Sequence, residues 1–396
     1  MLNHDTVREA TRLTRAGQLI EATALLQRML RGESTPESSG TPPHVAPARL
    51  KPPTIELEAK VVEERESPQT TQSSSAGPRR KSLAPFYSMK DFSGLRLRGS
   101  IRHVPPSTLD IAPKDGRFIE RTFSNAAGSR TYKLFIPSHY RGQPLPLIVM
   151  LHGCTQSPDD FATGTRMNFL AEQQNCFVVY PEQPSVANQA KCWNWFRMSD
   201  QQRGNGEPSL IAGISRQIMQ EYSIDPKRVY ACGLSAGGAA AAIMGTTYTD
   251  LYAAVGVHSG LACGAASDLP SALVAMRQGG GYEATGEARS QAPTIVFHGD
   301  RDTTVHPKNG DRVIEQSTKA KSPTTEVLRG RVPHGYAYTR TVITDAGGRA
   351  ISEHWNIHGA GHAWSGGSPA GSYTDPQGPD ASKEMLRFFL EHSLPS

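Results

Sequence analysis

Short apolar runs separated by polar and glycine-containing stretches dominate residues 112–396 of the chain. Five of these runs are four or five residues long and consist mainly of apolar side chains. Such runs are expected for parallel strands that are buried on both faces of a sheet. They lie at residues 147–151, 177–180, 228–232, 253–257 and 294–297. Segments long enough for crossover helices separate them, so the region is predicted to form a doubly wound, mostly parallel α/β sheet.

Hairpin and helix signals flank these runs. Residues 118–123 and 131–136 are joined across a short turn that contains glycine, which predicts an opening hairpin. A second turn at residues 345–348 precedes 351–357, the predicted last strand. The chain then closes with a predicted helix that is capped by Asp380 and has an apolar face to pack on the sheet.

The segment in front of this domain has a different pattern. Residues 1–32 carry two apolar stripes around Gly17, which predicts a short helical hairpin similar to one tetratricopeptide unit. A lone hairpin cannot bury both of its faces, so it would contact another protein, pair with a second copy or dock weakly on the α/β domain. Residues 33–111 lack apolar periodicity, which predicts a low-complexity and mostly disordered linker. Residues 112–396 would then form the one large domain.

Composition and charge exclude several classes of function. The net charge of +5 comes from scattered Lys and Arg without interleaved aromatic residues, so nucleic-acid binding is not indicated. No apolar stretch is long enough to span a membrane, and the N-terminus shows no secretory signal. The five cysteines contain no CxxC pair and are too few for a disulfide scaffold. We expect neither a metal nor another cofactor.

A glycine-flanked serine follows one of the predicted strands. The sequence Gly-Leu-Ser-Ala-Gly at positions 233–237 lies between an apolar run and four consecutive alanines. A serine that exposes its hydroxyl on a sharp strand-to-helix turn has unfavourable backbone angles, and glycines two positions away on either side prevent clashes. The following helix N-terminus favours developing negative charge. The pattern therefore predicts that Ser235 is a nucleophile; an ordinary glycine-rich turn is the alternative.

A second loop could supply an oxyanion hole. The sequence His-Gly-Cys-Thr-Gln at 152–156 follows the predicted strand at 147–151. In α/β-hydrolases the loop after this early strand supplies one backbone N–H to the oxyanion, and the residue after the nucleophile supplies the other. The predicted donors are the amides of Cys154 and Ala236. His152 is interpreted as a structural loop residue rather than a base.

An acidic loop follows the predicted strand at 294–297. Its sequence, His-Gly-Asp-Arg-Asp at 298–302, lies between the serine and the C-terminal histidines, where this fold carries its triad carboxylate. Asp302 lies beyond the turn and could reach back towards an imidazole. Asp300 directly follows Gly299 and is better placed to organise the loop by accepting backbone N–H bonds. We therefore predict Asp302 as the acid, with Asp300 as the rival.

The base is expected last in the chain. His362 lies between Gly361 and an aromatic segment after the predicted final strand, which gives the chain order serine, acid, base. His358 is the rival, but it lies closer to the strand end and is interpreted as structural. The two histidines also satisfy H-x-x-x-H, but the intervening glycines and the missing glutamate argue against a zinc site. Ser235, Asp302 and His362 would therefore perform acyl transfer through an acyl-enzyme.

Five motifs in this order resemble those of the polyhydroxybutyrate (PHB) depolymerase esterases. They span much of residues 112–396, and their joint order is more specific than any one of them. They are Leu-His-Gly-Cys-Thr-Gln at 151–156, Cys-Trp-Asn-Trp-Phe at 192–196, Gly-Leu-Ser-Ala-Gly-Gly at 233–238, His-Gly-Asp-Arg-Asp at 298–302 and Gly-His-Ala-Trp at 361–364. The resemblance implies an α/β-hydrolase with a Ser-Asp-His triad that acts on short-chain hydroxyalkanoate polyesters, often after export.

The chain departs from that family in two ways. Secreted depolymerases usually have a signal peptide and a polymer-binding module after the catalytic domain, and neither is visible here. Oligomers or other short-acyl esters are therefore plausible substrates, and an extracellular location competes with a cytoplasmic one. Related feruloyl and acetylxylan esterases share the architecture and are the nearest alternative. A scaffold protein that acts through the N-terminal hairpin is the alternative from another class.

Tryptophans and cysteines in the motifs suggest further contacts. Aromatic faces suit polyester or sugar surfaces, so we predict Trp195, Trp364 and Trp193 as substrate contacts, with loop packing as the alternative. Cys154 and Cys192 could form a disulfide between the oxyanion loop and the tryptophan loop, although the sequence does not fix their distance. Cys232, in a buried strand, is predicted to be a free thiol.

Overall fold

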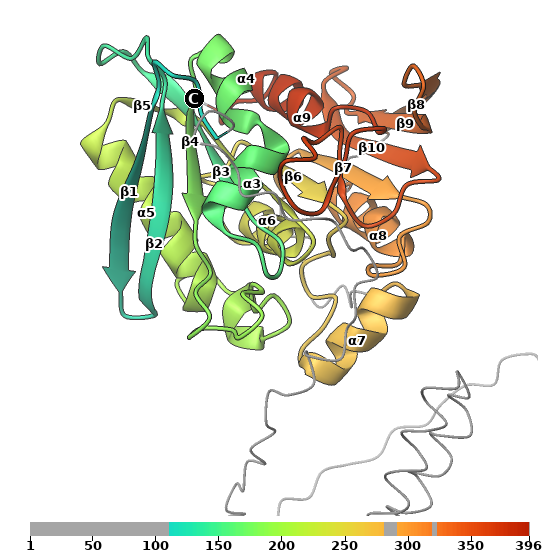
Figure 1. The fold of residues 1–396 in the computed structure, drawn as a ribbon. Helices are drawn as coiled ribbons and strands as arrows, with labels where there is room; N and C mark the ends of the chain where they lie inside the picture. The colour runs from blue at the N-terminus through green and yellow to red at the C-terminus, as the bar shows by residue number, and fades with distance from the viewer. Residues whose placement is uncertain (1–110, 281–290, 319–322, 396) are drawn as a thin grey trace, which may run out of the picture. The chain divides into compact units, whose positions relative to one another are not determined.

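The computed structural model describes residues 111–280, 291–318 and 323–395 (Figure 1). The predicted helical hairpin at 1–32 lies outside the described residues, as does the predicted linker at 33–111 except for its last residue. The described part of the chain therefore begins one residue before the predicted α/β domain.

A ten-stranded sheet forms the centre of the domain, in the order β1-β2-β4-β3-β5-β6-β7-β10-β9-β8. In this order the six strands β4, β3, β5, β6, β7 and β10 run parallel to one another, whereas the hairpins β1–β2 and β8–β9 join the two ends in antiparallel fashion. The strands are β1 (Arg117–Asn125), β2 (Gly128–Ile136), β3 (Leu145–Leu151), β4 (Phe177–Pro181), β5 (Ile224–Leu234), β6 (Ala254–His258), β7 (Thr294–Gly299), β8 (Thr324–Arg331), β9 (Ala337–Thr344) and β10 (Ala350–His358). A small second sheet pairs β11 (Trp364–Ser365) with β12 (Thr374–Asp375).

Helices cover both faces of the large sheet. They are α3 (Pro158–Thr165), α4 (Met167–Gln174), α5 (Gly206–Glu221), α6 (Ala236–Thr247), α7 (Leu269–Gln278), α8 (Lys308–Ser317) and α9 (Ala381–Leu390), with a short 3₁₀ helix η3 (Met198–Gln201). Helices α3, α4 and α9 pack on one face, and α5, α6 and α8 pack on the other (Figure 1). Helix α7 packs beside α8 rather than on the sheet.

The central strands carry apolar side chains on both faces of the sheet, so helices must pack on both faces. All seven residues of β3 are buried, and alternate side chains enter opposite cores: Leu147 and Val149 face α5 and α6, whereas Ile148 and Met150 face α3 and α9. This two-sided burial is typical of parallel sheets and explains the continuous apolar runs. The predicted α/β-hydrolase class with a mostly parallel sheet is therefore confirmed.

Strand β8 is absent from the predicted elements. Its residues are almost all exposed, with Val327 and Leu328 among the exposed apolar side chains, so it has no buried face to produce an alternating pattern. It is a strand because β9 pairs with it from Thr324 to Arg331, a tertiary contact that local sequence does not encode. The predicted turn at 345–348 is the connection between β9 and β10.

Candidate active site

Ser235 occupies the turn between β5 and α6. Its backbone angles are φ 58° and ψ −118°, a conformation that costs free energy for any residue other than glycine. Two hydrogen bonds hold it: the Ser235 amide donates to the His258 carbonyl at 2.8 Å, and the Ser235 carbonyl accepts from Ala239 at 2.9 Å. The turn presents Ser235 at a pocket rather than at a strand or helix surface.

The flanking glycines are required by close backbone contacts. A methyl group at Gly233 would lie 2.5 Å from the carbonyl oxygen of Leu151, and one at Gly237 would overlap that same oxygen. Strand β3 therefore passes too close to the turn for any side chain at these positions. The same packing brings the loop that follows β3 next to the serine.

Four of the candidate residues line one pocket. It has about 920 Å³ of space when the part open to solvent is counted, and most of its wall is apolar. Ser235, His362, Cys154 and Ala236 line it together. They come from the turn after β5, the loop after β10, the loop after β3 and the start of α6, all at the carboxyl ends of parallel strands, where ligands bind in open α/β sheets.

His362 and Asp302 form a close pair beneath this pocket. Nδ1 of His362 lies 2.6 Å from Oδ2 of Asp302. The other carboxylate oxygen accepts from the amides of Thr304 and Val305 at 2.9 and 2.8 Å. Burial by itself raises the pKa of Asp302, but hydrogen bonds from His298 and His362 outweigh it and hold the pKa well below its usual range. An ionised Asp302 fixes the Nδ1–H tautomer of His362, which leaves Nε2 as the basic nitrogen.

The rival acid and base form a separate pair. Oδ2 of Asp300 lies 3.0 Å from Nδ1 of His358, and Oδ1 accepts from the amide of Gly359 at 2.7 Å. Both side chains are exposed, and neither lines the pocket with Ser235. The contacts place Asp300 in the loop-organising role that its position after Gly299 suggests.

The two candidate oxyanion donors are backbone amides at the pocket wall. Ala236 is the first residue of α6, so its amide has no acceptor within the helix. In the loop after β3, the amide of Gly153 donates to the Gln156 side chain and that of Thr155 donates to the Ala190 carbonyl. Within the described part of the chain, no acceptor is present for the amide of Cys154 between them. Both predicted donors are thus available to a ligand.

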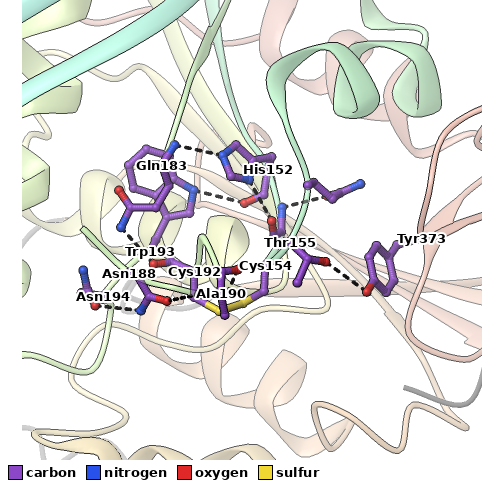
Figure 2. The surroundings of a disulfide bond; sticks show 12 residues. His152, Cys154, Thr155, Gln183, Asn188, Ala190, Cys192, Trp193, Asn194 and Tyr373 are labelled. Atoms are coloured by element: carbon purple, nitrogen blue, oxygen red, sulfur yellow. Dashed lines mark hydrogen bonds between the residues drawn. A yellow bond between two sulfur atoms is a disulfide. The ribbon is translucent and has the colours of Figure 1, made fainter. Parts of the chain in front are cut away.

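A disulfide joins Cys154 to Cys192, across a sequence separation of 38 residues (Figure 2). Both cysteines line the pocket. Beside them the buried His152 accepts the Gln183 amide at its Nε2 and donates from Nδ1 to the Gly153 carbonyl, at 3.0 and 2.8 Å. Burial lowers the pKa of His152 to about 4, so the ring is neutral and structural. Cys232 is a free buried thiol.

The tryptophan predictions need a correction. Trp195 lines the pocket, but Trp193 and Trp364 do not. The indole of Trp193 is fully buried and donates to the His152 carbonyl at 3.1 Å. Trp364 is also buried, with its indole donating to Ser382 at 3.0 Å. Large apolar rings beside the motifs fill the core of the loops here, and local sequence does not distinguish that use from substrate contact.

Two buried histidines for which no role was predicted pack behind the site. The ring of His258 is fully buried, stacks on Trp364 at 5.0 Å between centroids, and accepts the Ser365 amide at 2.9 Å through Nε2. Since its carbonyl also accepts from Ser235, it ties the serine turn to the segment after His362. Nε2 of the buried His298 lies 2.8 Å from the Val305 carbonyl and 3.4 Å from Asp302. In the sequence, both histidines stand at the end of a short apolar run, and this position is the feature that could have indicated a role for them.

Neither a metal site nor a membrane span emerges within the residues that the structure describes. No cluster of three or more His, Cys, Asp or Glu side chains could hold an ion there. No helix in those segments combines the length and apolarity needed to cross a bilayer.

Comparison with curated proteins finds several esterases. The chain is 34% identical over 288 residues to poly(3-hydroxyalkanoate) depolymerase C of Paucimonas lemoignei, covering 67% of this chain and 66% of the relative. It is 27% identical over 205 residues to acetylxylan esterase A of Talaromyces purpureogenus, covering 47% and 52% of the two chains. It is 32% identical over 152 residues to feruloyl esterase B of Neurospora crassa, covering 37% and 50%. The chain thus spans between half and two thirds of the length of these relatives.

Comparison of structures agrees at the level of fold. The acetyl xylan esterase from Aspergillus awamori matches with a TM-score of 0.55 at 21% identity, covering 70% of this chain and all of that one. The sequence profile described as esterase PHB depolymerase matches residues 130–323, a segment that includes β3, the Ser235 turn and Asp302. This segment of the chain therefore belongs to the esterase PHB depolymerase family.

Proposed function

We propose that the chain is a serine carboxylic ester hydrolase that cleaves short-chain hydroxyalkanoate polyesters or their oligomers. The observation that carries this proposal is the 2.6 Å pair of His362 and Asp302, whose imidazole lines the same apolar pocket as Ser235. A neutral imidazole oriented by a buried carboxylate, beside a serine held on a strained turn, is the arrangement that activates a hydroxyl for acyl transfer.

Each step assigns a task to a named group. Nε2 of His362 takes the proton of Ser235 while Oγ attacks the ester carbonyl carbon. The amides of Cys154 and Ala236 donate to the oxygen that becomes negative. His362 then gives its proton to the departing alcohol as the carbon–oxygen bond breaks. A water molecule, deprotonated by the same imidazole, hydrolyses the acyl-enzyme and restores Ser235.

The pocket chemistry supports a polyester over a carbohydrate. Among the described residues that line the pocket wall, none is acidic or basic other than His362. Aliphatic and aromatic groups from separate elements make up most of it: Trp195, Phe196, Leu261, Leu269, Leu273, Met276 and Val305. Apolar surface of this kind gains free energy by removing a hydrocarbon acyl group from water, whereas a sugar leaves its hydroxyls without partners there.

An acetylxylan or feruloyl esterase is the second candidate, because two relatives carry those names and an acetyl or feruloyl group would also enter an apolar pocket. The structure offers no support for the third candidate, a scaffold protein that recruits a partner through residues 1–32, since those residues lie outside its described part.

The test is a substrate panel with a matched serine control. Ser235→Ala should lower kcat on p-nitrophenyl butyrate by at least about 10⁴-fold, since removal of a triad serine abolishes the acyl-enzyme route. Ser124→Ala, on the exposed strand β1, serves as the control and should retain the parent rate. A Ser235→Ala protein with the parent rate would contradict the proposal. Release of 3-hydroxybutyrate from its oligomers, compared with acetate from acetylated xylan and ferulate from feruloylated xylan, separates the two ester classes.

A further inference from the structure

Two hydroxyl groups meet at the wall of the pocket. Oγ1 of Thr155 lies 3.2 Å from the phenol oxygen of Tyr373, and both residues line the pocket with Ser235 (Figure 2). Thr155 comes from the loop after β3 and Tyr373 from the segment just before β12, so residues far apart in sequence build this polar point. It stands out because most of the remaining wall is apolar.

The backbone at both residues is held in a strained conformation. Thr155 has φ 66° and Tyr373 has φ 53°, in the left-handed region that β-branched and aromatic residues avoid. The amide of Thr155 donates to Ala190 at 2.7 Å, and the carbonyl of Tyr373 accepts from Trp364 at 2.7 Å. The backbone that carries each hydroxyl is therefore held by a hydrogen bond to a neighbouring segment.

The neighbouring residues lock the two loops together. The side-chain amide of Gln156 donates to Asp160 at 3.0 Å, and the amide of Ser372 donates to the other oxygen of that carboxylate at 2.9 Å. Asp160 is almost fully buried, so it joins the residues that follow Thr155 and precede Tyr373. Backbone strain that is held in place by surrounding hydrogen bonds in this way is concentrated at functional sites.

Proton counting shows that the pair has a spare donor. Each hydroxyl carries one proton, and their mutual hydrogen bond uses one of the two. Among the described residues, neither oxygen has another hydrogen-bond partner. One O–H therefore remains to donate to a ligand in the pocket. Thr155 directly follows Cys154, a proposed oxyanion donor, so the pair shares a loop with that donor and a pocket with Ser235.

We propose that the Tyr373–Thr155 hydroxyl pair binds an oxygen atom of the substrate close to the scissile ester, and so selects hydroxyacid esters over plain alkyl esters. The inference rests on the proposed ester hydrolysis at Ser235. The oxygen can belong to the acyl part, as in a 3-hydroxyacyl unit, or to the alcohol part, as in the next repeat of an oligomer. Both sources offer the same chemistry, an oxygen acceptor beside an apolar chain.

Two substrate pairs that differ by one oxygen test the proposal. For the acyl side, p-nitrophenyl 3-hydroxybutyrate is compared with p-nitrophenyl butyrate, which has the same leaving group. For the alcohol side, 2-hydroxyethyl butyrate is compared with propyl butyrate, which has the same chain length. The parent protein should favour the oxygen-bearing member of one pair by about 10-fold in kcat/KM, the effect expected of one hydrogen bond. The pair that shows the preference identifies the source of the oxygen.

The variants remove the hydroxyls without changing shape. Tyr373→Phe and Thr155→Val should each weaken the preference, and the double variant should bring the ratio of the two kcat/KM values close to one. Tyr338→Phe, on β9 and away from this pocket, is the control that should keep the parent ratio. Near-ultraviolet circular dichroism checks that each variant is folded, and the two single variants provide independent routes to the answer.

The outcomes separate the two proposals. If the parent protein shows no preference in either pair, or if the folded double variant keeps the parent preference, the hydroxyl-pair inference is wrong. If Ser235→Ala hydrolyses these substrates as fast as the parent, ester hydrolysis at Ser235 is wrong instead. Loss of the preference in the double variant, with Ser235→Ala inactive, supports both.

Discussion

At the scale of single residues, burial and hydrogen bonding distinguish two carboxylates that are two positions apart in the sequence. Asp302 is buried and orients His362, whereas Asp300 is partly exposed and bonds His358 and Gly359. The two Asp-to-His spacings in the sequence are of similar length, so the prediction of Asp302 rests on its position beyond the turn and not on a known distance to His362. The depressed pKa of Asp302, with its cause in two imidazole neighbours, identifies the residue suited to stabilise a histidine cation.

Asp302→Asn tests this assignment. An amide at that position stabilises the wrong tautomer of His362, so kcat should fall by about 10³- to 10⁴-fold with KM little changed. Steady-state kinetics on p-nitrophenyl butyrate measure the change. Asp300→Asn removes the matching charge outside the pocket and should stay within about three-fold of the parent, since exposed ion pairs contribute little. Equal losses in the two variants would contradict the assignment.

At the scale of elements, α7 forms one wall of the pocket with a single helical face. Leu269, Ala272, Leu273 and Met276 follow the spacing that places side chains on one side of a helix, and all four line the pocket. Val274, on another face, is 54% exposed. Helix α7 packs beside α8 rather than on the sheet, so its inner face borders the pocket as well as the edge of the core.

Met276→Ala is expected to lengthen the acyl chains that the pocket accepts. Truncation removes a flexible apolar side chain from the wall, and each methylene in such a pocket changes specificity by about 10-fold or more. The ratio of kcat/KM for p-nitrophenyl octanoate over the butyrate ester should therefore rise by about 10-fold. Val274→Ala truncates the same helix on its exposed side and should leave the ratio unaltered. A parallel rise in both variants would mean that α7 acts through general loosening.

At the scale of the whole domain, neutral buried histidines connect loops that are distant in the sequence. His152 accepts the Gln183 amide, and His258 accepts the Ser365 amide. Each acceptor nitrogen must be unprotonated, because a proton there would face an N–H donor. Burial accordingly lowers the pKa of His152 to about 4 and that of His258 well below its ordinary value.

Stability should therefore fall in mild acid. The unfolded chain takes up protons on these imidazoles near pH 6.5, whereas the folded domain does not, so unfolding binds protons in that window and acid favours it. Their stabilising effect is complete at neutral pH and is lost as the pH falls from about 6.5 towards 4, by on the order of 3 kcal/mol for His152. Burial raises the pKa of Glu207, which acts in the opposite direction.

Calorimetric measurement of Tm between pH 7 and pH 4 detects this loss. His152→Gln should unfold at lower temperature at neutral pH and show a shallower pH dependence. His139→Gln, on an exposed histidine, should reproduce the parent curve. A parent Tm that stays constant from pH 7 to pH 5 would contradict the expectation.

The sequence by itself determined the fold class, the chain order of the candidate serine, acid and base, and the family, because these depend on local patterns. Apolar runs report strands buried on both faces, and glycines two positions from Ser235 report a turn against which β3 packs. Tertiary structure decided which aspartate meets His362, that Trp193 and Trp364 are core residues, and that Tyr373 reaches Thr155. The physical reason is that these contacts join segments from separate strand ends, and the distance between them is set by how the sheet packs rather than by their own sequence.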